Sequence, residues 1–205
     1  VDSLMIPSDI SYGRQPDGSD TWVFFSEPTP NESNVTHGAN AFCDFPEFSI
    51  NGGVYSSAVE VLIATSLTDY PIFYTLDGSD PTINSLIYDS PIVIGETKVL
   101  RAATISSDCI SNEIATQTYL INEELTLPAV SITTNPDNLW DNEIGIYVLG
   151  DNYENWNPYF GANFWEDWER PIHIEFFEPD GTLGFAQDAG VKIFGGWSRA
   201  MGQKS

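Results

Sequence analysis

Closely spaced turn sequences are the feature that most limits what this chain can fold into. Turn-forming residues, chiefly Pro, Asp, Asn and Gly, gather at 16–18, 51–53, 76–78 and 179–181. Between them lie short runs rich in Val, Ile, Tyr, Phe and Thr, which often alternate with polar residues. This pattern is typical of many short strands. The sequence therefore predicts a mainly β protein, with helix expected only at 136–140, after the capping residue Asn135, and near 164–168.

The chain divides into three segments. Residues 1–36 hold a short strand at 21–25 and a polar, Pro-rich linker. Residues 42–122 carry strand candidates at the spacing of a β-sandwich, and more candidates follow in residues 127–205. The clearest expected strands are 59–63, 72–75, 92–94, 99–103, 116–120, 129–133, 145–148, 172–177 and 190–194.

Acidic residues greatly outnumber basic ones. The 205 residues include 30 Asp and Glu but only 7 Lys and Arg, which gives a net charge of −23 at pH 7. Such a charge repels nucleic acids and anionic membrane surfaces, so we expect neither as a partner. No apolar run reaches the roughly 18 residues of a membrane span, so membrane insertion is not expected either. Both ends look like cut ends, and we expect a fragment of a longer protein.

The stretch 190–205 is the strongest candidate for a binding site. It contains three of the seven cationic side chains, around a Gly-Gly pair and a Ser-Arg step. Small residues let a backbone approach a ligand, and neighbouring cations attract a phosphate or another anion. A β-hairpin with ordinary surface cations is the structural alternative. The candidate anion-binding residues are Lys192, Gly195, Gly196, Ser198, Arg199 and Lys204.

The central segment carries an ordered series of landmarks at 52–55, 72–82, Tyr88 and 98–102. The series resembles the chitobiase/β-hexosaminidase C-terminal-type module. That resemblance implies an immunoglobulin-like β-sandwich and an accessory role in a secreted or cell-surface bacterial protein.

The two cysteines, Cys43 and Cys109, leave two interpretations open. Two buried free thiols are the simpler one, and a single bridge is the alternative. Cys43 precedes the first sandwich strand, and Cys109 lies in the turn that joins the last two. In an immunoglobulin-like sandwich these points share one end, so a bridge is feasible.

The last segment resembles the opening part of the CotH family, the spore-coat protein H type of atypical secreted kinase. The matching stretches are 127–134, 138–140, 145–148, 168–177 and 190–205. The resemblance implies that the candidate anion-binding residues lie near the phosphates of ATP, with Mg²⁺, in a full-length parent, and that the acidic catalytic residues lie beyond Ser205. Phe194 and Met201-Gly202 depart from the His and the aromatic-Pro pair usual in that family.

Residues 9–22, 28–30 and Asn34 are similar to the last strands of a bacterial lamin-tail-like domain. The expected organisation is thus a lamin-tail remnant with a linker at 1–36, an immunoglobulin-like module at 42–122 and the truncated start of a CotH kinase-like domain at 127–205. The expected fold class is mainly β, an immunoglobulin-like β-sandwich followed by a β-rich partial CotH-type domain.

Other polar groups have simple structural interpretations. Asp69, Asp77 and Asp80 suit calcium by type, but the full loop pattern is absent and turn chemistry explains them. A helix cap and a solvated face explain the polar stretch 135–143 in the same way. The only histidines, His37 and His173, are far apart in sequence, so neither an acid/base pair nor a zinc site is expected. We predict no catalytic residue and no metal ligand in this chain.

Tryptophan is concentrated in the last segment. Core packing is the first interpretation, because aromatic side chains bury large areas. For the loop 150–168, which is dense in Asn, Trp, Tyr and Gly, a surface or partner contact is the alternative. The tryptophans concerned are Trp140, Trp156, Trp165, Trp168 and Trp197.

These observations lead to one main hypothesis, a non-catalytic fragment of a secreted or cell-surface modular bacterial protein. Its expected partners are other domains of the same chain and, beyond them, a protein or a polysaccharide. No cofactor is expected in the fragment itself. The alternatives are a carbohydrate-binding accessory module and ATP-dependent Ser/Thr protein kinase activity of the full-length parent.

Overall fold

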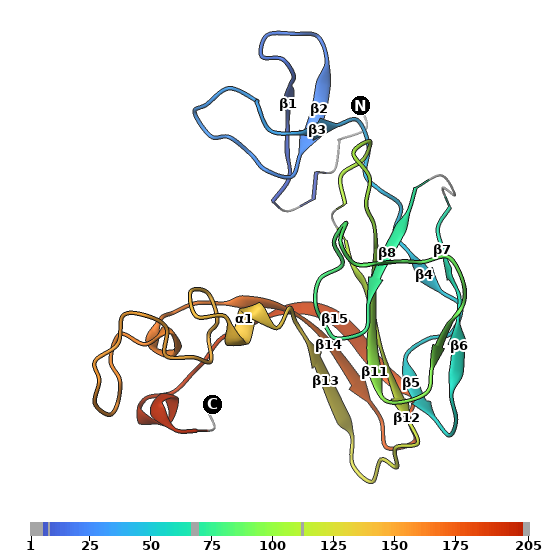
Figure 1. Ribbon diagram of the computed structural model, residues 1–205, viewed down its shortest axis with the longest axis vertical. Coiled ribbons are helices and arrows are strands. Elements are labelled where there is room, and N and C mark those ends of the chain that lie inside the picture. Colours follow the sequence, from blue (N-terminus) through green and yellow to red (C-terminus); the bar gives the residue numbers. More distant parts are fainter. Residues whose placement is uncertain (1–5, 8, 67–69, 112, 203–205) are drawn as a thin grey trace.

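The computed structural model describes residues 6–7, 9–66, 70–111 and 113–202 (Figure 1). Five β-sheets and little helix account for its regular structure, so the predicted mainly β class is confirmed. The first sheet is antiparallel, in the order β1-β2-β3. Its strands are β1 (Ser11–Arg14), β2 (Trp22–Phe25) and β3 (Gly38–Ala39).

The central segment is a sandwich of two layers. Its strands are β4 (Glu47–Phe48), β5 (Gly53–Tyr55), β6 (Val59–Val61), β7 (Ile63–Ala64), β8 (Ile72–Thr75), β9 (Leu86–Ile87), β10 (Ile92–Ile94), β11 (Lys98–Thr104) and β12 (Ala115–Ile121). One layer is the five-stranded sheet β5-β12-β11-β8-β9, and the other holds the pairs β10-β6 and β4-β7. Figure 1 shows β6 and β7 lying along one side of this central sheet.

Alternate residues of both layers fill the core between them. Val61, Leu100 and Tyr119 are completely buried there, and the Tyr119 hydroxyl donates to the carbonyl of Ile50 at 2.7 Å. The expected strand 59–63 is interrupted at Leu62. Its N–H donates to the Ser49 hydroxyl and its carbonyl accepts from Ser49, so β6 pairs with β10 while β7 pairs with β4.

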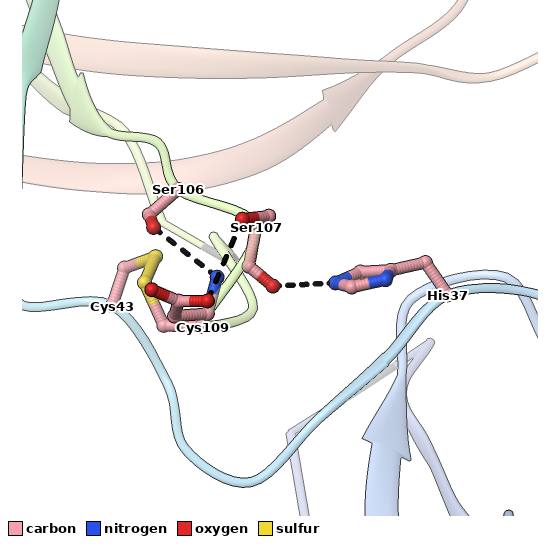
Figure 2. The surroundings of a disulfide bond; sticks show 6 residues. His37, Cys43, Ser106, Ser107 and Cys109 are labelled. Atoms are coloured by element: carbon pink, nitrogen blue, oxygen red, sulfur yellow. Dashed lines mark hydrogen bonds between the residues drawn. A yellow bond between two sulfur atoms is a disulfide. The ribbon is translucent and has the colours of Figure 1, made fainter.

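A disulfide ties the chain before the sandwich to the loop before β12. Cys43 and Cys109 are bonded, with Cα atoms 4.9 Å apart, so the free-thiol interpretation is wrong and the bridge is present. Cys43 N–H also donates to the Ile110 carbonyl at 2.8 Å. Figure 2 shows a second tie, in which His37 Nε2 donates to the Ser107 carbonyl at 2.6 Å. The N-terminal sheet is thereby anchored to one end of the sandwich.

The last segment forms an antiparallel sheet in the order β13-β14-β15, which we call the third sheet because it belongs to the third segment of the chain. Its strands are β13 (Ala129–Thr133), β14 (Arg170–Phe177) and β15 (Leu183–Val191), so the strand expected at 190–194 ends earlier. The helical turns are α1 (Asp137–Trp140), η1 (Asn163–Trp165) and η2 (Trp197–Ala200). Among the described residues no helix has the length and apolar character needed to cross a membrane.

The strand predicted at 145–148 is wrong. The N–H groups of Ile146 and Tyr147 donate to carbonyls of the α1 region, Asn138 and Leu139, at 2.9 and 3.0 Å. These donors are satisfied by the helical turn, so no neighbouring strand is needed, and Ile146 is buried in a small separate cluster. The helix at 136–140 is nearly as expected, with the Asn135 side-chain oxygen accepting from Asp137 N–H at 3.1 Å.

Candidate functional site

The third sheet is joined to the sandwich through a buried carboxylate. Glu175 of β14 is 1% exposed, and its Oε1 accepts a hydrogen bond from the Thr118 N–H of β12 at 3.2 Å. Pairing of β12 with β5 begins at Tyr119, one residue after Thr118. The Glu175 carboxylate therefore accepts a hydrogen bond from a backbone N–H at the edge of that pairing. A Cβ added at Gly52 would lie 2.7 Å from the Thr118 carbonyl and 3.0 Å from Glu175 Oε1. Only glycine leaves room for this close approach.

A second contact joins the sandwich turn 76–80 to the start of α1. Asp80 pairs with Arg101, which is buried and also donates from Nη1 to the Gly78 carbonyl at 2.8 Å. The other Asp80 oxygen accepts from Asn135 Nδ2 at 3.3 Å. Asp77 accepts from its own turn, at Ser79, and these hydrogen bonds lower the pKa of the Asp77 carboxyl. Asp77 therefore stabilises its own turn and Asp80 links the turn to Asn135, in line with the structural interpretation. Asp69 lies outside the described residues.

Two further contacts complete the interface between the sandwich and the last segment, which we call the joint. The hydroxyls of Thr118 and Ser131 are 2.7 Å apart. The β14–β15 turn lies against β5, where a Cβ added at Gly181 would meet Val54 at 2.8 Å. Gly181 has φ +85°, a backbone angle that L side chains rarely adopt, so glycine is required there on two counts. The joint thus extends from the sandwich turn 76–80 to the β14–β15 turn.

A cleft of about 610 Å³ opens beside the joint, between β12 and the β14–β15 pair. His173 lies on its wall, with Nδ1 2.8 Å from an Asp188 oxygen. Because a carboxylate only accepts, Nδ1 is the donor, and the other nitrogen of neutral His173 is an acceptor. Neither His173 Nε2 nor Glu175 Oε2 has a hydrogen-bond partner among the described residues, and both atoms are buried. Burial raises the pKa of the Glu175 carboxyl above its ordinary value.

The predicted anion-binding residues lie elsewhere, beyond the end of β15. Lys192 Nζ is 2.8 Å from Asp167 Oδ1, and this cation holds the pKa of Asp167 below its usual range. Arg199 donates to the Gly195 carbonyl at 2.7 Å and lies over the Trp165 ring at 5.7 Å. The two cations are thus engaged with neighbouring groups of the chain.

The backbone at Gly196, in the Gly-Gly pair of this stretch, is open to a ligand. A Cβ added at Gly196 would meet no atom within 4 Å, so a ligand has room beside this backbone. Ser198 is half-buried on η2 close by. Lys204 lies outside the described residues. An anion site at these positions remains a prediction.

Aromatic side chains gather on the surface near this stretch. Phe160 lies between Trp156 and Trp197, with ring centroids 6.3 Å away from each. Trp156 is 59% exposed and Trp197 is 66% exposed, and Trp140 is also on the surface. Core packing is therefore wrong for these three, while Trp165 and Trp168 are half-buried. The predicted exposure of aromatics in the loop 150–168 holds for Trp156 and Phe160.

Comparison with known proteins bears on the sandwich. Residues 50–118 match the family model of the chitobiase/beta-hexosaminidase C-terminal domain. The matched range covers β5 to β11 and the first part of β12, and so most of the two-layered core. We call these residues the chitobiase-type module. No curated protein and no solved structure matches the chain.

Sequence reasoning did not identify the joint or the cleft beside it. Alternation in the strand 172–177 places His173, Glu175 and Phe177 on one face, and a carboxylate between them is a signal of a special role. Its partner, a backbone N–H of β12, has no sequence signature. Gly52 was noted as a landmark of the module, and its close approach to Glu175 gives a physical reason for the glycine.

Proposed function

We propose that this chain is a non-catalytic accessory region of a modular, secreted or cell-surface bacterial protein. In this proposal the chitobiase-type module holds the following segment, residues 127–205, in a fixed orientation. The observation that carries it is the buried contact of Glu175 with Thr118 beside Gly52, because a mobile linker between two domains leaves no carboxylate sealed between them.

The neighbouring segments complete this proposal. Residues 127–205 correspond, by their motifs, to the leading part of a CotH-type domain, and residues 1–36 to the end of a lamin-tail-like domain. The anchoring of the N-terminal sheet through the disulfide supports an arrangement in which the sandwich is a rigid spacer.

A single glycine substitution tests the fixed orientation. In Gly52→Ala the new methyl group crowds Glu175 Oε1 of β14 as well as the Thr118 carbonyl of β12, so we expect β14 to lift from β12 and the radius of gyration in small-angle X-ray scattering to increase. Gly95→Ala is the matched control, because its Cβ meets only Ala58, at an ordinary 3.9 Å. A scattering curve of folded Gly52→Ala that superimposes on that of Gly95→Ala would contradict the fixed joint.

Carbohydrate binding is the second candidate function. The family of the module supports an accessory role of this kind, and the exposed rings of Trp156 and Trp197 offer apolar faces on which sugars stack. In Trp156→Ala and Trp197→Ala we expect weaker retention on the polysaccharide that the intact chain binds. A glycan array that shows no binding by the intact chain would remove this candidate.

Kinase activity belongs, in our proposal, to a longer parent. There ATP and Mg²⁺ would approach the backbone at Gly196, where the structure leaves space, with Lys192 and Arg199 released from their present partners to meet phosphates. Replacing both cations by Ala in that parent is expected to weaken nucleotide binding, and unchanged ATP affinity would reject the assignment.

A further inference from the structure

We infer that the cleft beside the joint is a binding site for a small ligand that carries a primary ammonium group. This goes beyond the proposed function, which needs the joint but not the cleft.

The charge of the lining is the first argument. Four carboxylates line this cleft, and no Lys or Arg is among the described residues around it. Arg101, behind Thr116, faces a neighbouring hollow and is already paired with Asp80. Even in a chain of net charge −23, a cleft with four carboxylates and no cation favours a positively charged occupant. The carboxylates are Glu47, Glu113, Glu175 and Asp188.

The second argument is the state of Glu175. It is 1% exposed, yet one of its oxygens has no donor among the described residues. Burying a carboxylate oxygen without a hydrogen-bond donor costs free energy. A ligand that donates a hydrogen bond to this oxygen removes that cost and is bound more tightly for it. This unpaired oxygen calls for a hydrogen-bond donor whatever the charge of the other three carboxylates.

His173 adds a second acceptor on the same face of β14. Its Nδ1 donates to Asp188, so in the neutral ring the other nitrogen, Nε2, is an acceptor, and it has no partner among the described residues. Two acceptors two residues apart on a strand lie on one face of the sheet. An ammonium group has three N–H donors and a positive charge, and so fits a carboxylate and a neutral imidazole together.

Other cations fit this cleft less well. Ca²⁺ takes six to eight oxygen ligands, and the described residues contain no group of three His, Cys, Asp or Glu side chains placed to hold a metal. Phe45 and Phe48 line the same cleft and give the carbon skeleton of an organic ligand an apolar contact. Glu175 and His173 line the cleft while their two acceptor atoms are buried, so the ligand reaches these atoms when the side chains shift.

A pair of ligands that differ only at nitrogen tests the inference on the full 205-residue chain. Ethanolamine carries N–H donors, whereas choline has the same charge and skeleton but none. We expect ethanolamine to shift the amide resonances of Gly52 and Thr118, and choline to bind at least about tenfold more weakly, because charged hydrogen bonds are the strong ones. Equal binding of the two, or no shift at millimolar ethanolamine, would overturn the inference.

Variants locate the site. Glu175→Gln keeps an oxygen for Thr118 but removes the charge, and we expect at least about a tenfold loss of ethanolamine affinity. Glu178→Gln removes one charge just beyond β14 and should bind as the unchanged chain does. If Glu175→Gln does not fold, Asp188→Asn at the surface serves instead, because it removes another of the four carboxylates that line the cleft and should also weaken binding. Unchanged affinity in a folded variant would reject the site.

Two further ligands distinguish the sources of an ammonium group. Glucosamine represents an amino sugar, and Nα-acetyl-lysine amide represents a lysine side chain; the natural source is expected to bind more tightly than ethanolamine. N-acetylglucosamine, which lacks the charge, should not bind. Displacement of ethanolamine by micromolar Ca²⁺ or Zn²⁺ in a Glu175-dependent way would identify an inorganic cation and overturn the assignment.

Discussion

The sandwich and the third sheet bury their apolar residues in different ways. In the sandwich, residues of both layers face each other and form one closed core around Leu100 and Tyr119. In the third sheet one face lies against β12 of the sandwich, while Val130 and Ile132 on the other face are 53% and 58% exposed. The first region therefore carries its own stability, and the second depends on its contact with the first.

The difference explains why polar groups matter so much at the joint. The contact is made by two carboxylates, two hydroxyls and a side-chain amide as well as by apolar packing. Hydrogen bonds of this kind are directional and fix an orientation, whereas apolar burial alone tolerates sliding. The joint is thus better suited to setting an angle than to supplying stability.

The largest effect should come from a matched pair of truncations. Leu100→Ala leaves a cavity in the closed core, and we expect a loss of about 3 to 5 kcal/mol in the free energy of unfolding. Val130→Ala, on the exposed face, should change it by less than about 0.5 kcal/mol. Urea unfolding of both variants measures the two values. Similar losses would show that the third sheet is as tightly packed as the sandwich.

Removal of the disulfide should have the next largest effect. Cys43 and Cys109 close a loop with a sequence separation of 66, and their replacement by Ala should destabilise the chain by about 2 to 4 kcal/mol. The N-terminal sheet should loosen first, while the amide of Thr118 at the joint keeps its chemical shift. A shifted Thr118 amide together with an unchanged N-terminal sheet would show that the disulfide supports the joint and not the N-terminal sheet.

The smallest expected effect is a pH dependence of stability that arises from Glu175 at the joint. The pKa of Glu175 is raised by burial, so the folded chain holds this proton more tightly than the unfolded chain does. Its contribution to stability is fully present below the unfolded pKa of about 4.3 and is lost as pH rises through the raised folded pKa. Measured against Glu175→Gln, the unchanged chain should therefore lose stability over that range.

An aspartate with the opposite shift provides the control for this pH experiment. Hydrogen bonds from Ser79 lower the pKa of Asp77, so its contribution is present above the unfolded pKa and is lost as pH falls through the lower folded value. Compared with Asp77→Asn, the unchanged chain should gain stability as pH rises. The same slope in both comparisons would show that Glu175 is not desolvated at the joint.

Much of the fold could be predicted from local patterns. The strand 129–133 was predicted to the residue, and those at 72–75 and 92–94 likewise, because alternating apolar residues between turn signals leave one arrangement. The prediction failed at 145–148, where the hydrogen-bond donors of an apolar run found their partners in α1. It also misjudged Trp140 and Trp197, because a large ring can be buried only where other residues cover it.

The sequence by itself determined the mainly β class, the module at 50–118 and the places of most turns, because these depend on residues close together in the chain. Only the tertiary structure decided that Cys43 bonds Cys109, that Glu175 reaches Thr118 past Gly52, and that a carboxylate-lined cleft opens beside them. Thr118 and Glu175 are 57 positions apart in sequence, and the two cysteines are 66 apart. Contacts at such separations depend on how whole layers pack, and local propensities carry no record of that packing.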